Sequence, residues 1–301
     1  MSVSMAEAGG ASRSRELLRQ SYGLIQSLAV LLVLVVVMSI LSPCFLSWIN
    51  IANLMGQMAV PLIVVAVSAT VMLQYGIVAG VLVSLLIGPA VGWMNGMVTT
   101  KGRIPSFIVT LGTMMMARSL AFVTTGGQVV SDLPEAFKAL GQARPWGVPL
   151  PFLIALLTYA VGWFVLTRTA FGKRVYAVGA NRMVATLSGI RADRVKIQCM
   201  MIVGFTASFA GNLLLARIGA IQADTARGLE LEVIAAVVIG GTSLFGGRGS
   251  VFLTAVGVLI PASLENGLIM VGLNTFWRDV MVGVVLILAV YLDQTGRGQR
   301  R

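Results

Sequence analysis

Residues 77–99 read IVAGVLVSLLIGPAVGWMNGMVT, an apolar stretch without a single charged side chain. A helix of about 20 such residues crosses the hydrocarbon core of a bilayer. Eight more apolar segments flank this one, at 22–42, 51–74, 104–125, 148–167, 195–218, 229–245, 250–273 and 275–292. We therefore predict an all-α, polytopic helical membrane protein with about nine apolar segments. A single transmembrane domain over residues 1–301 accounts for all of them.

The composition supports this interpretation. Of the 301 residues, 57% are hydrophobic and 11% are charged, whereas soluble domains carry about 25% charged residues. Membrane lipid is therefore the predicted surroundings of most of the surface. The chain has no histidine, and its two cysteines, Cys44 and Cys199, lie near the ends of different apolar segments. We predict no metal site, no cofactor, no catalytic residue and no enzymatic activity, because no nucleophile-plus-base arrangement is present.

The net charge of +11 is concentrated at the boundaries of the apolar segments. Basic residues gather in the 1–21 tail, at Lys101 and Arg103, in the 168–196 loop and in the 294–301 tail. Such an excess of Lys and Arg marks the cytoplasmic side of a membrane protein. We predict a multi-pass protein of the bacterial cytoplasmic (inner) membrane with both termini in the cytoplasm. The same distribution argues against a nucleic-acid partner, which would need a basic patch of its own.

The segment count contains a parity conflict. If the N-terminus and the 168–196 loop are both cytoplasmic, an even number of crossings must separate them, but five segments lie between. The second half is consistent, because four segments return the C-terminus to the inside. Lys101 and Arg103, in contrast, would lie outside after three crossings. The conflict therefore originates between residues 43 and 100, where one segment does not span or one crossing is missing.

A cluster of glycines marks the segment 229–247. Residues 236–250, AVVIGGTSLFGGRGS, contain five glycines in fifteen positions. A phosphate-binding loop needs the pattern G-x-x-x-x-G-K-[ST], but Gly247 occupies the lysine position and no strand precedes it. We exclude nucleotide binding and predict a broken or re-entrant helix, which membranes tolerate where it is buried in protein or lines a wet cavity.

This predicted helix break supplies candidate pathway residues, namely Gly240, Gly241, Thr242 and Ser243. Glycine-mediated helix packing or a simple turn between helices is the alternative explanation. Arg118 and Glu265 are further polar residues inside apolar segments, and charges at membrane depth must face protein, water or an interface. A pairing between these two is one possibility.

Several motifs resemble those of bacterial ABC-transporter permeases of the ribose type. They are Asn95-Gly96, IPSFIVTLGT at 104–113, VGAN at 178–181 followed by Ala185 and SGI at 188–190, the stretch 231–250, ENGL at 265–268 and AVYLD at 289–293. The resemblance covers most of residues 50–293. One departure stands out, because the Gly-Gly-Ile-Asp-Leu-Ser-Val-Gly-type motif of these permeases is absent after residue 70. Such permeases usually have about ten helices, whereas nine apolar segments are counted here. The missing motif falls in the same region, residues 43–100, in which the parity count fails.

The resemblance implies the membrane-spanning permease subunit of an importer for a monosaccharide of the ribose, xylose or galactose class. Separate ABC ATPase subunits would energise it, a second permease subunit would complete a homodimer or heterodimer, and a periplasmic or lipid-anchored binding protein would deliver the solute. The 168–196 loop would be the ATPase coupling loop, with a short helix over Asn181 to Ile190 that Gly189 ends. Its candidate residues are Gly179, Asn181, Ala185, Ser188, Gly189 and Ile190.

Asn266, a polar residue inside an apolar segment, is a further pathway candidate, and an interhelical hydrogen bond is the alternative explanation for it. Asn95 and Thr110, which lie in the matching motifs, complete the candidate pathway. Two other functions stay open. The first is a permease of the same family whose solute is a branched-chain amino acid, a nucleoside or another small polar compound. In the other, the missing segment leaves a transport-defective variant with only a structural role.

Overall fold

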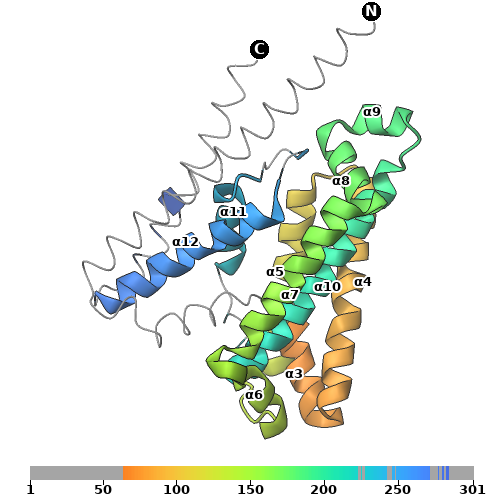
Figure 1. Ribbon diagram of the computed structural model, residues 1–301. Coiled ribbons are helices and arrows are strands. Elements are labelled where there is room, and N and C mark those ends of the chain that lie inside the picture. The colour runs from red at the N-terminus through yellow and green to blue at the C-terminus, as the bar shows by residue number, and fades with distance from the viewer. Residues whose placement is uncertain are drawn as a thin grey trace, which may run out of the picture. The chain divides into compact units, whose positions relative to one another are not determined.

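The computed structural model describes residues 64–222, 225, 228–242, 246–247, 249–271, 277, 280 and 283–284 (Figure 1). The predicted tails 1–21 and 294–301 and the predicted segment 22–42 lie outside these residues. The helices are α3 (Val64–Tyr75), α4 (Ile77–Lys101), α5 (Ser106–Thr125), α6 (Glu135–Gln142), the 3-10 turn η1 (Pro145–Gly147), α7 (Leu150–Arg168), α8 (Ala170–Ala180), α9 (Arg182–Leu187), α10 (Ala192–Ile218), α11 (Leu229–Ile239) and α12 (Val251–Met270). They fall into two compact units, of which one ends at Glu230 and the other begins at Leu231.

Five of the described helices are long and apolar enough to cross a membrane, namely α4, α5, α7, α10 and α12. Their outward faces carry large exposed apolar side chains, such as Leu86 of α4 and Leu120 of α5. In water such a surface would be unstable, whereas in lipid it is the expected one. The protein is a polytopic helical membrane protein, as the sequence predicts. That the whole chain forms a single domain stays a prediction.

The centre of the first unit is the contact between α4 and α10. Small residues recur every four positions on one face of α4, at Gly80, Ser84, Gly88, Gly92 and Gly96, and all of them are buried. Residues four apart lie on the same face of a helix, so this stripe is continuous and lets the two backbones touch. A Cβ atom on Gly96 would lie 2.9 Å from the Cα atom of Ile197, and one on Gly88 would overlap the backbone of Gly204. Because rising numbers on α4 meet falling numbers on α10, the two helices are antiparallel.

A helical hairpin precedes this contact. Gly76 alone separates α3 from α4, with a φ of 92° that L-residues rarely adopt. The hairpin closes tightly, since a Cβ on Gly80 would lie 2.7 Å from the Cβ atom of Met72. Met72 also belongs to the buried apolar cluster of this unit, together with Phe137 of α6 and Leu215 of α10. The short amphipathic helix α6, within the polar stretch 126–147, thus seals one end of the bundle.

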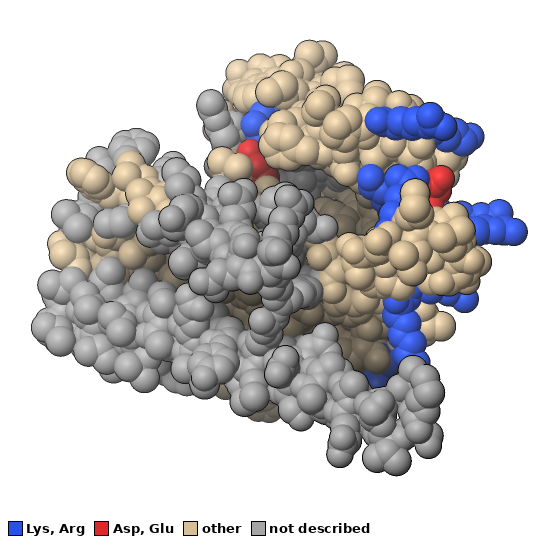
Figure 2. Space-filling model, turned by 90° about the horizontal axis from the view of Figure 1, so that it is seen from above, with Lys and Arg blue, Asp and Glu red and all other residues tan. Residues whose placement is uncertain are grey.

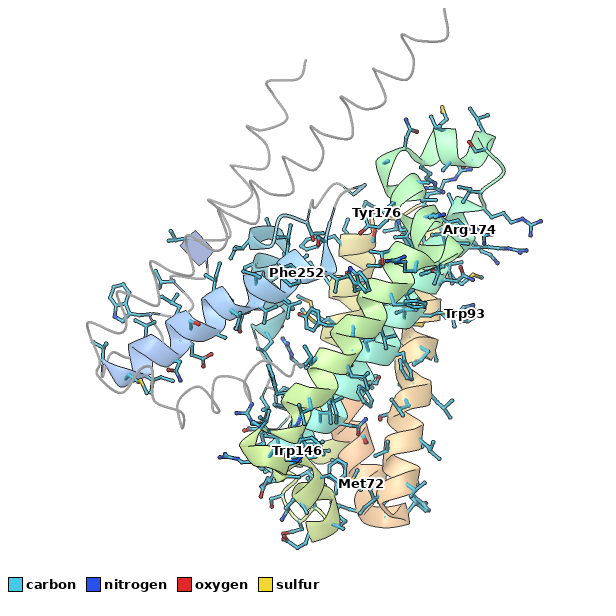
Figure 3. The ribbon with its side chains drawn as sticks, in the orientation of Figure 1. Met72, Trp93, Trp146, Arg174, Tyr176 and Phe252 are labelled. Atoms are coloured by element: carbon cyan, nitrogen blue, oxygen red, sulfur yellow. The ribbon has the colours of Figure 1, made fainter. Side chains whose placement is uncertain are left out.

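The antiparallel arrangement places the basic residues of the first unit together. Lys101 ends α4 and Ala192 begins α10, so Lys101 and Arg103 lie at the same end as the 168–196 loop. We call this the basic end of the unit, and Figure 2 shows Lys and Arg side chains gathered around it. Trp146 and Arg174 mark the opposite end and the basic end in Figure 3. Two candidate spans, α5 and α7, separate Lys101 from the loop, an even number that agrees with their shared end. The origin of the parity conflict between residues 43 and 100 stays a prediction.

Candidate functional site

The glycine-rich stretch ends helix α11, in the second unit. Gly241 has a φ of 78°, its N–H donates to the carbonyl of Val238 at 2.8 Å, and the N–H of Thr242 donates to Val237 at 3.1 Å. These two bonds form a Schellman motif, which satisfies the last carbonyls of a helix. At 1.5 Å per residue α11 is about 16 Å long, roughly half of the hydrocarbon core. Helix α11 thus ends within the predicted segment 229–247. That the helix is broken or re-entrant within the membrane stays a prediction.

Gly240 serves a second purpose, the close crossing of α11 and α12. A Cβ on Gly240 would lie 2.6 Å from the carbonyl oxygen of Leu253, and a Cβ on Gly257 would overlap the carbonyl of Ala236. Thus glycine-mediated packing, the alternative explanation for this cluster, applies at Gly240. The Thr242 hydroxyl lies 3.3 Å from that of Thr254. Ser243 lies outside the described residues.

Asn266 is a buried polar residue of α12. Only 7% of it is exposed, and among the described residues its Oδ1 atom has no hydrogen-bond partner. Ser263, one turn earlier, is buried on the same helix. A buried carbonyl oxygen without a partner costs roughly 1–3 kcal/mol, and such a group in a native structure needs an explanation. A position beside the solute pathway would give one, but that role stays a prediction.

Asn95 and Thr110 take different positions. Asn95 is buried in α4, and its Oδ1 accepts a hydrogen bond of 2.6 Å from the Thr113 hydroxyl of α5. Thr110 lies one turn before Thr113, and its hydroxyl donates to backbone carbonyls of its own helix, Ser106 at 3.0 Å and Phe107 at 3.1 Å. Asn95 therefore contributes to the packing of α4 against α5. Whether either residue lines the pathway is untested.

At the basic end, the predicted short helix is present as α9. The side chain of Asn181 caps its start by accepting from the backbone N–H groups of Met183 at 3.0 Å and Val184 at 3.1 Å. Gly189, with a φ of 80°, and Ile190 close a Schellman motif by donating to Thr186 and Ala185, both at 3.0 Å. Ala185 is buried, Ser188 is exposed, and Gly179 lies in the preceding α8. Burial raises the pKa of the neighbouring Tyr176 phenol, which thus stays neutral.

The outward face of α9 is apolar. Met183 is 74% exposed, Val184 56% and Leu187 83%. Ile190, a candidate residue of the coupling loop, is half-buried. These three side chains are not among those candidates, although a helix starting at Asn181 puts positions 183, 184 and 187 on one face. Arg182 at the edge of this face pairs with Asp193.

A network of hydrogen bonds between polar side chains of the first unit was not predicted from the sequence. Asn212 of α10 donates to the Ser84 hydroxyl and to the Ser208 carbonyl, and its Oδ1 accepts from Ser68 at 3.0 Å. The Ser68 hydroxyl oxygen also lies 2.9 Å from the carbonyl oxygen of Gly80. The network joins α3, α4 and α10 through buried side chains, and each residue alone looks unremarkable in an apolar segment.

Arg118 has an ion-pair partner that the sequence did not suggest. Its Nη2 atom lies 3.8 Å from Oε1 of Glu230, in the first turn of α11. Glu230 belongs to the same compact unit as α5.

Comparison with known proteins identifies the kind of molecule. The family described as the permease component of branched-chain amino acid transport systems matches residues 21–290. The chain belongs to this permease family. The ribose import permease protein RbsC of Bacillus subtilis (strain 168) is 36% identical over 291 residues, covering 88% of this chain and 90% of its own.

Further relatives transport sugars by name. RbsC of Escherichia coli (strain K12) is 34% identical over 297 residues, covering 89% of this chain and 92% of its own. The L-arabinose ABC transporter permease protein AraH of Azospirillum brasilense is 38% identical over 237 residues, or 79% of this chain and 70% of its own. No solved structure matches the chain. The protein is therefore a multi-pass transport permease of the ABC type and not an enzyme, as the sequence predicts.

Proposed function

We propose that this chain is the membrane-spanning subunit of an importer for a monosaccharide of the ribose, xylose or galactose class. It pairs with a second permease subunit, receives its solute from a soluble binding protein and is energised by separate ATPase subunits. The relatives named for ribose and arabinose import support this solute class. The basic end then faces the cytoplasm, as do both termini.

Helix α9 is the observation that carries the proposal. A six-residue helix is too short to be stable by itself, yet this one is capped at both ends and exposes Met183, Val184 and Leu187. An exposed apolar face at an otherwise charged end is typical of a protein–protein contact. On this proposal the ATPase covers that face, and ATP-driven movement is passed to α10 through the closing motif at Gly189.

The decisive experiment measures ATPase binding and sugar uptake together. The chain is co-expressed with candidate ABC ATPase and binding-protein subunits, and uptake of labelled ribose, xylose and galactose is recorded. Leu187→Asp should abolish both uptake and co-purification of the ATPase. The matched control is Leu140→Asp, because Leu140 is 59% exposed at the opposite end of the same unit and should leave ATPase co-purification intact.

Other outcomes would contradict the proposal in distinct ways. Uptake of leucine or a nucleoside without sugar uptake would assign a different solute to the permease. Complete absence of uptake in an assembled complex would favour the transport-defective alternative, for which the departure from the family motif near Gly76 is the reason. Retained ATPase binding by Leu187→Asp would show that α9 is not the contact.

A further inference from the structure

Arg118 of α5 and Glu230 of α11 form an ion pair with a long separation. Its two charged atoms are 3.8 Å apart, beyond the 2.7–3.2 Å of an N–H···O hydrogen bond. Within the part of the chain that the structure describes, neither side chain makes a hydrogen bond. A guanidinium has five N–H donors in a planar fork, so the donors of Arg118 are available to a further partner.

The depth of the pair makes this arrangement costly. Arg118 lies seven residues before Thr125, the last residue of α5, which corresponds to about 10 Å along the helix axis. A charge within a membrane span costs several kcal/mol unless it faces protein or a water-filled space, and an intramembrane ionisable residue is a functional-site candidate for that reason. The side chains are 22% and 35% exposed, so neither is fully covered by the rest of the protein.

We infer that Arg118 and Glu230 form a solute-binding subsite that recognises vicinal hydroxyl groups of a neutral sugar. The inference rests on the proposed function. A hydroxyl oxygen can accept a hydrogen bond from Arg118 and donate its own proton to Glu230, whereas an apolar solute offers neither. Because the pair has no net charge, it suits a neutral polyol without a charge penalty. A site built to bond hydroxyls rejects an analogue that lacks one, because its own polar groups are then left unpaired.

Discrimination between sugars tests this subsite. In the assembled transporter, initial uptake rates are measured for ribose and for 2-deoxyribose, which lacks one hydroxyl of a vicinal pair. Glu230→Gln should lower ribose uptake roughly tenfold, because ribose loses a charge-assisted hydrogen bond to the carboxylate. It should also reduce the preference for ribose over 2-deoxyribose, since a solute without the hydroxyl has no such bond to lose. Glu135→Gln is the matched control, because Glu135 forms an exposed ion pair with Lys138 at 3.1 Å and should leave both rates unchanged.

Exchanged and conservative variants separate recognition from stability. Arg118→Glu combined with Glu230→Arg restores an ion pair, so it should keep the wild-type thermal midpoint while ribose uptake stays low. Glu230→Asp keeps the charge but shortens the reach, and should reduce ribose uptake without loss of folded protein. Recovery of ribose uptake in the exchanged pair, or an equal loss for both sugars together with a lower midpoint, would make the pair purely structural.

The wild-type control distinguishes the two levels of the argument. If the wild-type complex imports no sugar, the proposed function fails and the subsite fails with it. If the wild type imports ribose and Glu230→Gln leaves the ratio of ribose to 2-deoxyribose unchanged, only the subsite is refuted. If leucine uptake replaces sugar uptake and depends on both residues, the pair recognises a zwitterion and the inference is wrong.

Discussion

Replacing Gly92 by alanine should separate α4 from α10. A Cβ at this position would lie 2.7 Å from the carbonyl carbon of Met200 and 2.9 Å from the Cα atom of Met201. The Cβ would also overlap the carbonyl oxygen of Met200. Carbon atoms pack favourably from about 3.5 Å, so the backbones must part by at least about 0.8 Å. Because these atoms are backbone, no side-chain rotation can relieve the overlap.

The free-energy cost follows from this displacement. Overpacking of this kind costs about 1–3 kcal/mol, and stretching the two bonds from Asn212 to other helices adds roughly 0.6 kcal/mol for each. Against this stands the gain of about 1 kcal/mol from replacing glycine by alanine in a helix. The net expectation for Gly92→Ala is a loss of about 1–3 kcal/mol.

Gly162→Ala is the matched control, since Gly162 lies inside α7 and a Cβ there meets nothing within 4 Å. It should gain up to about 1 kcal/mol from helix propensity alone. The thermal unfolding midpoints of the two purified variants should then differ by roughly 2–6 °C, with the wild type between them. Equal midpoints, or a less stable Gly162→Ala, would refute the reasoning that α4 and α10 are in backbone contact.

Three more predictions concern different parts of the chain. Asn212→Leu should lower the free energy of unfolding by about 1–3 kcal/mol, because its two buried serine partners, Ser68 and Ser84, lose their hydrogen bonds to it. Urea or thermal unfolding measures this loss. In a cysteine-free background, single cysteines at Lys101 and Arg182 should be protected from an impermeant thiol reagent in intact cells. A single cysteine at Trp146, which is 91% exposed at the opposite end, should react with the reagent. Labelling at Lys101 would contradict the shared basic end. Gly189→Ala should weaken ATPase activation by sugar at unchanged membrane expression, because alanine at a φ of 80° costs roughly 1–2 kcal/mol and loosens the end of α9.

Much of this architecture is predictable from the sequence, because long apolar runs and punctuating glycines act locally. The predicted segment at 77–99 corresponds to α4, the break near 229–247 to the end of α11, and the short helix after Asn181 to α9. The Asn181 cap and the left-handed Gly189 are signals within one turn of chain, so they can be recognised in a single sequence.

The misses share another cause, the long range of the contacts. Asn212 bonds to Ser68, 144 positions away, and Arg118 pairs with Glu230 across more than a hundred residues. No periodicity or spacing in one sequence specifies such partners, because they follow from how the helices pack. Helix α6 was missed for a related reason, since its charged stretch hides the one buried aromatic residue, Phe137, that holds it against α10.

The one-residue link at Gly76 has a consequence for biosynthesis. Two apolar helices joined by a single residue have no polar loop between them. The growing chain therefore cannot pause between the membrane insertion of the first helix and that of the second. We expect α3 and α4 to leave the translocon as one antiparallel pair, already packed together at Met72 and Gly80. The order in which this chain enters the membrane is therefore set in part by one glycine.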